Sequence, residues 1–138
     1  MPDEITRVDY YMGALPNKPG EGAKVLAALK AAGVNLVACL GYRKSAKIAE
    51  IVLAVAENTP ALAKAVKPAG LKLGKKCKAL LITGEDRVGA LAEGGEKLGA
   101  AGISVVSLHA VAAGAGRFGA LLTVDPKDLK KAAKVLGG

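Results

Sequence analysis

Aromatic side chains are scarce in this 138-residue sequence, which has no tryptophan, one phenylalanine and three tyrosines. With 51% hydrophobic residues and only 3% aromatic ones, a core of alanine, valine, leucine and isoleucine is expected. Sheets that bind single-stranded nucleic acid stack bases on aromatic side chains of neighbouring strands. The scarcity of aromatic residues therefore argues against a base-stacking surface.

Long apolar runs are also missing. No stretch approaches the roughly 18 consecutive apolar residues that indicate a membrane-spanning helix. The first residues, MPDEITRVDYYMG, carry acids where a secretory signal has basic residues, and they have no apolar core. We therefore expect a cytoplasmic protein that has no membrane partner.

Residues for redox, metal or catalytic chemistry are few. The two cysteines, Cys39 and Cys77, are expected to be free reduced thiols. The single histidine, His109, has no cysteine or acid at ligand spacing, so no metal site is predicted. Neighbouring acids occur only as the pairs Asp3–Glu4 and Glu85–Asp86, and no nucleophile–base set is visible. We expect neither a cofactor nor enzymatic activity.

The formal net charge of +8 has two readings. A basic protein attracts anionic partners such as nucleic acid or a phosphate ligand. Lysines scattered over helix faces also serve solubility alone. The densest basic cluster is Lys72, Lys75, Lys76 and Lys78. Because charge alone produces non-specific attraction, it predicts no nucleic-acid site, and its role stays open.

An internal repeat organises the chain. KPGEGAKVLAALKAAGVNL (Lys18–Leu36) returns as RVGALAEGGEKLGAAGISV (Arg87–Val105). The matching residues are 69 positions apart, as in the pairs Gly20 and Gly89, Leu29 and Leu98, Ala31 and Ala100, Ala32 and Ala101, and Gly33 and Gly102. A fixed offset across a whole segment is the signature of a duplicated structural unit. The sequence therefore predicts two units, residues 1–76 and 77–138. Each is small enough that the two should share a core or a sheet edge.

The predicted order in each unit is strand, helix, strand, strand, helix, strand. In the first unit we predict strands over 9–15, 34–42 and 48–56, a helix over 22–32, and a short helix within 57–70. Residues 71–83 are predicted to hold the last strand of unit one and the first strand of unit two. The fold class is α+β, with two ferredoxin-like βαββαβ units whose antiparallel sheets carry helices on one face.

The second unit lacks its own last strand, because the chain ends at Gly138 directly after the final helix. The exposed sheet edge is then bare, paired with the first unit, or covered by another chain. Since bare edges invite partners, we predict a homodimer or a higher homo-oligomer.

The two repeats resemble the ACT domain, a small regulatory module. The resemblance rests on NKPGEGAKVLAALKAAGVNL and GEDRVGALAEGGEKLGAAGISV, in which a glycine turn follows the first strand and a glycine–apolar–Asn/Ser step enters the second. It covers nearly the whole chain, as a tandem ACT protein. It implies units paired side by side and a small ligand, usually an amino acid, bound between units against the glycine turn.

The candidate ligand-binding residues lie in and near these turns. Main-chain N–H groups at a helix start hold carboxylates or phosphates, and glycine allows close approach. Side chains of either turn, or of the entry to the second strand of a unit, are expected to supply further contacts. The alternative is that these residues only build turns and caps. The candidates are Asn17, Lys18, Gly20, Asn35, Glu85, Asp86, Arg87, Gly89 and Ser104.

The favoured function is therefore allosteric ligand sensing, in which a small molecule, expected to be an amino acid, binds near the glycine turns at a boundary between units. One alternative is an adaptor that has lost its ligand and binds a protein partner through its sheet edge. A third is an RNA-binding module, because GRFGALLTV (Gly116–Val124) faintly resembles an RNA-recognition strand. Phe118 within it has the parity of the helix-covered face, which argues against this reading.

Overall fold

The computed structural model of the chain describes residues 3–137. They form two compact units. We call Asp9–Cys77 the continuous unit, and the described residues up to Val8 together with those from Lys78 onward the split unit. The units divide the chain differently from the predicted 1–76 and 77–138, because the first residues cluster with the second repeat.

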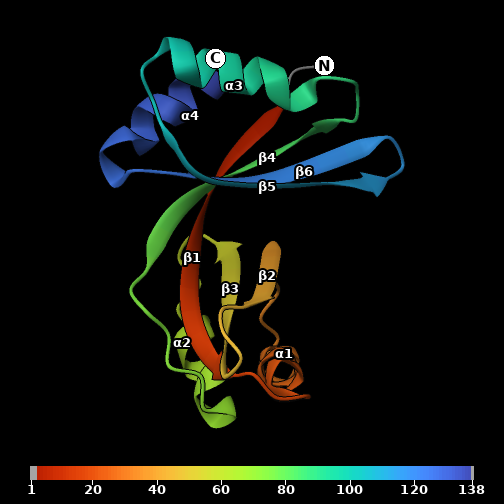
Figure 1. The fold of residues 1–138 in the computed structure, drawn as a ribbon, viewed down its shortest axis with the longest axis vertical. Helices are drawn as coiled ribbons and strands as arrows, with labels where there is room; N and C mark the ends of the chain where they lie inside the picture. Colours follow the sequence, from red (N-terminus) through yellow and green to blue (C-terminus); the bar gives the residue numbers. More distant parts are fainter. Residues whose placement is uncertain (1–2, 138) are drawn as a thin grey trace. The chain divides into compact units, whose positions relative to one another are not determined.

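Six strands and four α-helices follow one another along the described residues. They are β1 (Glu4–Pro16), α1 (Glu21–Ala31), β2 (Ala38–Arg43), β3 (Ile48–Ala56), α2 (Ala61–Val66), β4 (Cys77–Glu85), α3 (Ala90–Ala100), β5 (Val105–Gly114), β6 (Arg117–Val124) and α4 (Leu129–Gly137). The hydrogen-bonded strand order is β2-β3-β1-β4-β6-β5 (Figure 1). No helix within residues 3–137 is long and apolar enough to cross a membrane.

The continuous unit uses β2, β3 and the later part of β1, with α1 and α2 packed on them. The period-two alternation of β3 places Ile51, Leu53 and Val55 on one face. These side chains are buried against Val25 and Leu29 of α1 and against α2. The helices therefore cover one face of the strands, as the α+β prediction requires.

The split unit contains β4, β5, β6, α3, α4 and the start of β1. Its core joins Leu98 of α3 and Ala132 of α4 to Ile82 of β4 and Leu122 of β6, and Ile5 of β1 packs against it. In Figure 1, α3 and α4 lie on the same side of these strands. The second repeat, which has no last strand of its own, is thus completed by the first strand of the chain, next to β4.

Strand β1 is therefore longer than predicted. It begins at Glu4 rather than Asp9 and runs for 13 residues, against about five or six in a typical strand. Its first residues belong to one unit and its later residues to the other. The acids and polar residues at the start of the chain hid this extension, because they do not show the alternation expected of a half-buried strand.

Other element predictions were right or needed small corrections. Strand β3 has the predicted bounds, whereas β2 begins at Ala38 rather than Val34. The predicted last strand of the first repeat is reduced to one isolated bridge between Gly13 and Leu73. Both repeat helices end as expected at a left-handed glycine, with φ of 70° at Gly33 and 73° at Gly102.

Candidate ligand-binding site

The two glycine turns have the same main-chain geometry. Gly20 and Gly89 precede α1 and α3 with φ of 87° and 77°, a conformation that glycine adopts without steric cost. The amide of Asn17 donates to the Lys47 carbonyl at 2.8 Å, and the amide of Asp86 donates to the Gly116 carbonyl at 2.8 Å. Both donors and both acceptors differ by the repeat offset of 69. The duplication therefore extends to individual hydrogen bonds.

In the continuous unit, the turn side chains are used locally. Asn17 Nδ2 donates to the Ala46 carbonyl at 3.0 Å, which ties the turn to the β2–β3 hairpin. Lys18 is exposed, and its amide donates to the Pro16 carbonyl at 2.9 Å. Of the predicted ligand-binding groups of this turn, the Asn17 amide group is thus engaged within the protein.

In the split unit, Arg87 is the centre of an ion-pair cluster. Its Nη1 lies 3.2 Å from Asp3 Oδ1, and its Nη2 lies 3.1 Å from Glu93 Oε2. Nη1 also donates to the Glu85 carbonyl at 3.0 Å. The hydrogen bonds to Asp3 and then to Glu93 raise the pKa of the guanidinium above its ordinary value. Arg87 therefore already holds two carboxylates and is not an open anchor for a ligand carboxylate.

Asp3 and Glu93 were not among the predicted site residues. Asp3 directly precedes β1, and its carboxylate lies where a Cβ at Gly84 would overlap it, so the contact requires glycine at the end of β4. The absence of a closing strand in the second repeat was the signal that could have found Asp3. A strand supplied from elsewhere in the chain brings its own flanking charges to the turn.

Beside this cluster lies a shallow depression of about 300 Å³ in the split unit. Three predicted residues, Asp86, Arg87 and Gly89, line it together with the first turn of α3. Ala110–Ala112 of β5 and Phe118 of β6 form its remaining wall. The structure thus brings together the core of the predicted site of the second repeat.

The first turn of α3, which lines this depression, includes an amide that has no main-chain partner outside the helix within the described residues. The amides of Ala90 and Ala92 donate to the carbonyls of Arg87 and Gly89 at 3.2 and 3.0 Å. Among residues 3–137, the Leu91 amide has no main-chain acceptor outside the helix. The helix dipole adds partial positive charge at this end. An anionic group in the depression would therefore find a favourable donor.

The other predicted residues lie outside the depression. Glu85 is exposed at the end of β4, and only its carbonyl reaches Arg87. Ser104 is exposed one residue before β5, whereas the part of β5 that lines the depression is Ala110–Ala112. Asn35 is exposed in the loop before β2 of the continuous unit. Within one chain, these three do not converge with Asp86.

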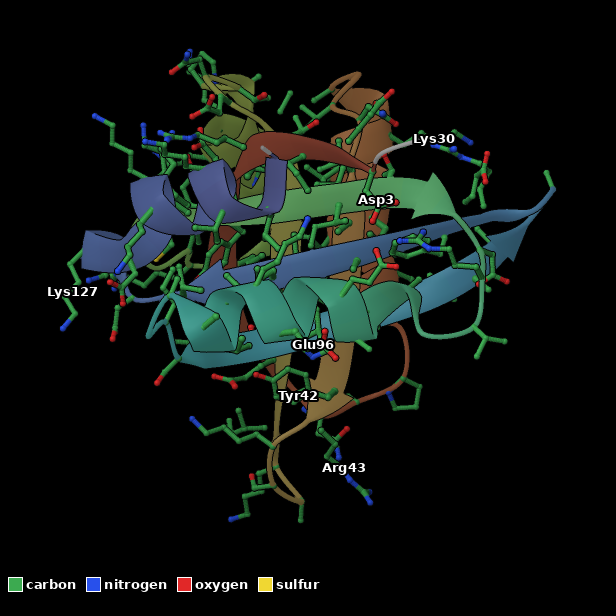
Figure 2. All side chains as sticks on the ribbon, turned by 90° about the horizontal axis from the view of Figure 1, so that it is seen from above. Asp3, Lys30, Tyr42, Arg43, Glu96 and Lys127 are labelled. Atoms are coloured by element: carbon green, nitrogen blue, oxygen red, sulfur yellow. The ribbon has the colours of Figure 1, made fainter. Side chains whose placement is uncertain are left out.

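The residues considered for other chemistry do not form a second centre. Cys39 and Cys77 are free thiols, and burial raises the pKa of Cys39. Within residues 3–137, no group of histidine, cysteine, aspartate or glutamate is arranged to hold a metal ion. Phe118 is buried in the split-unit core, so it offers no stacking surface for a base. Figure 2 shows Lys30, Arg43 and Lys127 extending away from the ribbon of their own units.

Comparison with known proteins identifies the fold. No protein-family model and no curated sequence matches the chain. A protein from Bacteroides thetaiotaomicron matches with a TM-score of 0.75 at 19% identity, covering 98% of this chain and 88% of that one. The regulatory subunit of aspartate kinase from Thermus thermophilus matches at 0.71 and 13% identity, and that from Thermus flavus at 0.66 and 14%. Each of the two Thermus matches covers 99% of this chain and 95% of the aspartate kinase subunit.

These similarities are structural, because the identities are too low to carry more than the fold. They extend over almost the full length of both chains, so both units fall within the matched residues. The strand order and the paired helices in each unit agree with the ferredoxin-like repeats predicted from the sequence. The chain therefore has the tandem ACT-type fold that its two repeats predicted.

Proposed function

We propose that this protein is a regulatory module that binds a small molecule, an amino acid, in the depression at the glycine turn of the split unit. The observation that supports this most directly is the convergence of Asp86, Gly89 and the start of α3 in one open depression. The fold it shares with regulatory subunits of aspartate kinase supports a sensing role rather than a catalytic one.

The chemistry of the depression suits a zwitterion. A ligand carboxylate would accept from the Leu91 amide at the positive end of α3. The ligand ammonium would pair with the exposed carboxylate of Asp86. Arg87 would position the turn through Asp3 and Glu93 rather than contact the ligand. We assign ligand binding first to this turn, because Asn17 in the other turn is already engaged with Ala46.

Assembly would complete the site. Strand β5 ends the strand order, carries no formally charged residue, and exposes Val106 at 64% and Val111 at 66%. Long exposed apolar edges pair with other strands. If two copies of β5 paired antiparallel about Leu108, the partner's Ser104 would lie opposite Ala112, because 104 and 112 are equally far from 108. Ser104 would then reach the depression from a second chain.

Such a site explains how binding would regulate. A ligand held by two chains binds the associated state more tightly than the separate chains, so it must shift the equilibrium towards association. Asn35 occupies the equivalent position in the first repeat and is proposed for the same role there. The partner whose activity depends on this equilibrium is proposed to be a protein, as in the adaptor alternative.

The test is a thermal-shift screen against the amino acids, repeated by size-exclusion chromatography with light scattering. We expect one or two amino acids to raise the melting temperature and to increase the dimer fraction. Asp86→Asn should abolish the response, whereas Glu96→Gln, an exposed acid on α3, should leave it intact. If no amino acid raises the melting temperature, or if Asp86→Asn responds like the wild type, the proposal fails.

The adaptor function is the second candidate, favoured by the length and apolar exposure of β5. The adaptor function requires a protein partner on β5, whereas the sensor function requires a bound amino acid. An adaptor would show no stabilisation by any amino acid and would lose its protein partner when β5 receives a charge. A sensor would keep ligand-induced stabilisation in the wild type whether or not a further protein binds.

A further inference from the structure

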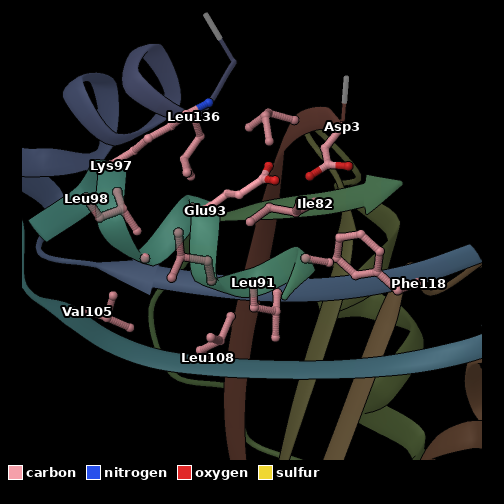
Figure 3. Close-up of a pocket in the computed structure, with 15 residues that line it drawn as sticks. Asp3, Ile82, Leu91, Glu93, Lys97, Leu98, Val105, Leu108, Phe118 and Leu136 are labelled. Carbon is pink, nitrogen blue, oxygen red and sulfur yellow. The ribbon is translucent and has the colours of Figure 1, made fainter. Parts of the chain in front are cut away.

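A second hollow lies in the split unit, between α3 and the sheet (Figure 3). Its volume is about 80 Å³. The walls are apolar side chains from β4, α3, β6 and α4, namely Ile82, Leu98, Phe118, Leu122 and Leu136. Val105 and Leu108, which are 44% and 43% exposed, line it from β5.

The repeat explains why this hollow exists. Gly94 of α3 lines it, and the residue 69 positions earlier is Val25, which is fully buried in the core of the continuous unit. The second repeat thus has a hydrogen where the first has an isopropyl group. A Cβ at Gly94 would lie 3.3 Å from Leu136 Cδ2 of α4. Among the described residues outside the neighbouring part of α3, no other atom lies within 4 Å of it, so the space beside Gly94 is filled only from α4. Glycine inside a helix is also less favourable than alanine. A bound ligand in the hollow would offset this loss of stability.

The charges at the rim are not equivalent. Asp3, Glu93 and Lys97 all line the hollow. The two carboxylates are held by Arg87. Lys97 has no ion-pair partner among residues 3–137, and the residue at its repeat position in α1 is Ala28. The rim charge that is open to a ligand is therefore positive.

We propose that this hollow binds a short branched aliphatic carboxylate, with its alkyl end among the apolar walls and its carboxylate at Lys97 Nζ. At about 10–15 Å³ for each water-sized group, the space holds roughly six such groups. An alkyl chain of that size is buried without an unpaired polar atom. An α-amino acid fits less well, because its ammonium would need a carboxylate that Arg87 already holds. The hollow adjoins the depression at the glycine turn and shares Phe118 with it, but of the two only the hollow is lined by Gly94 and Lys97.

The chain offers a direct probe of occupancy. Phe118 is the single phenylalanine of the sequence, so its ring protons form one identifiable set of NMR signals. The probe ligand is 4-methylpentanoate, compared with the neutral 4-methylpentan-1-ol and with leucine. We expect saturable shifts of the Phe118 ring and intermolecular NOEs to the ligand methyl groups, with affinity in the order carboxylate, alcohol, leucine.

Two pairs of variants locate the ligand. Gly94→Ala narrows the hollow and should weaken binding by at least about tenfold, since the alkyl end loses space among packed neighbours. Gly99→Ala lies in the same helix outside the hollow, carries the same gain in helix propensity, and should leave binding unchanged. Lys97→Gln should weaken the carboxylate about three- to fivefold without affecting the alcohol, and Lys134→Gln should affect neither.

Several results would overturn the proposal. No saturable shift of Phe118 at millimolar 4-methylpentanoate would remove the site itself. Equal affinity for the alcohol, or tighter binding of leucine, would refute the carboxylate assignment. Binding unchanged by Gly94→Ala would place the ligand elsewhere. Because Phe118 lines both the hollow and the depression, the Gly94→Ala and Lys97→Gln variants assign its shifts to the hollow, whereas Asp86→Asn tests the depression.

Discussion

The continuous and split units share a main-chain design and differ in what their side chains do with it. In both, the amide three residues before the glycine that starts the helix donates to a carbonyl of the facing hairpin at 2.8 Å, and a left-handed glycine follows the helix. In both, the main-chain amide after that glycine donates to the carbonyl of the last buried leucine of the helix. The Val34 amide donates to the Leu29 carbonyl at 3.0 Å, and the Ile103 amide to the Leu98 carbonyl at 2.9 Å.

The side chains then diverge. The continuous unit buries Val25 in its core, where the split unit has Gly94. Asn17 bonds the turn of the continuous unit to its hairpin, whereas the split unit has Asp86 at that position and an ion-pair cluster around the next residue, Arg87. In the split unit, a depression lies at the glycine turn and a hollow lies under α3. The continuous unit has a depression of about 340 Å³ that the glycine turn does not line; its lining residues are Asp9, Tyr11, Asn58, Thr59, Pro60 and Lys76. The comparison teaches that side-chain differences on a duplicated main-chain frame place the open pockets of the two copies at different positions.

The largest expected effect comes from removing the strand that completes the split unit. Deleting residues 1–8 removes Ile5 and the buried Val8. Amides of the split-unit core, such as that of Leu122, should lose hydrogen-exchange protection, while that of Leu53 in the continuous unit keeps it. Hydrogen exchange measured by NMR checks this, with exposed Arg7→Ala as the control. Equal loss in both units would show that they unfold as one.

The next effect tests the core difference. Val25→Gly gives the continuous unit the residue of the split unit, and we expect the free energy of unfolding to fall by about 3 kcal/mol from the lost packing and helix propensity. Leu26→Gly, at a 45% exposed neighbour, should cost about 1 kcal/mol. Urea unfolding measures both. Equal losses would mean that Val25 packing contributes little to this unit.

The strands at the two ends of the strand order, β2 and β5, differ in charge and length. A lysine introduced into β5 tests whether that difference controls association. β2 has six residues and ends in Arg43, whereas β5 has ten and no formal charge. We expect Val111→Lys to raise the dissociation constant of the proposed dimer by about tenfold or more, because charged edge residues block strand pairing. Sedimentation velocity checks this. Val88→Lys, at a fully exposed turn residue, should not alter association.

The smallest effect is a pH dependence confined to the continuous unit. Tyr42 Oη donates to Glu50 Oε1 at 2.7 Å, whereas the repeat-equivalent cross-strand pair is Val111 and Gly119. This hydrogen bond, together with Lys44, lowers the pKa of Glu50. A lowered pKa stabilises the fold above the ordinary value of 4.5, and the stabilisation is lost as the pH falls through the folded value.

Tyr42→Phe should therefore reduce the melting temperature slightly at neutral pH and have a vanishing effect at strongly acidic pH. Melting curves of both proteins from neutral to acidic pH measure the difference. Because the pair lies on an exposed surface, a small effect is expected. A difference that grows on acidification would show that Glu50 is not stabilised in its charged form.

Much of the fold was readable from local pattern. The constant offset of 69 predicted the duplication, and the alternation in Ile48–Ala56 predicted β3 with its inward face. Gly33 predicted a left-handed helix end. These features depend on neighbours in sequence, so a single chain reveals them. The glycine turns were likewise predicted, together with Asp86, Arg87 and Gly89, which the depression brings together.

The sequence by itself determined that this protein is two copies of one small α+β unit, because periodicity and glycine placement are local properties. Only the tertiary structure decided that the first residues complete the second copy, that Asp3 and Glu93 occupy Arg87, and that Gly94 leaves a hollow. The contacts behind these features, such as Asp3 with Arg87 and Ile5 with the split-unit core, join residues far apart in the sequence. No periodic pattern in the sequence predicts such pairs. Long-range pairing, not local propensity, therefore distinguishes the two copies.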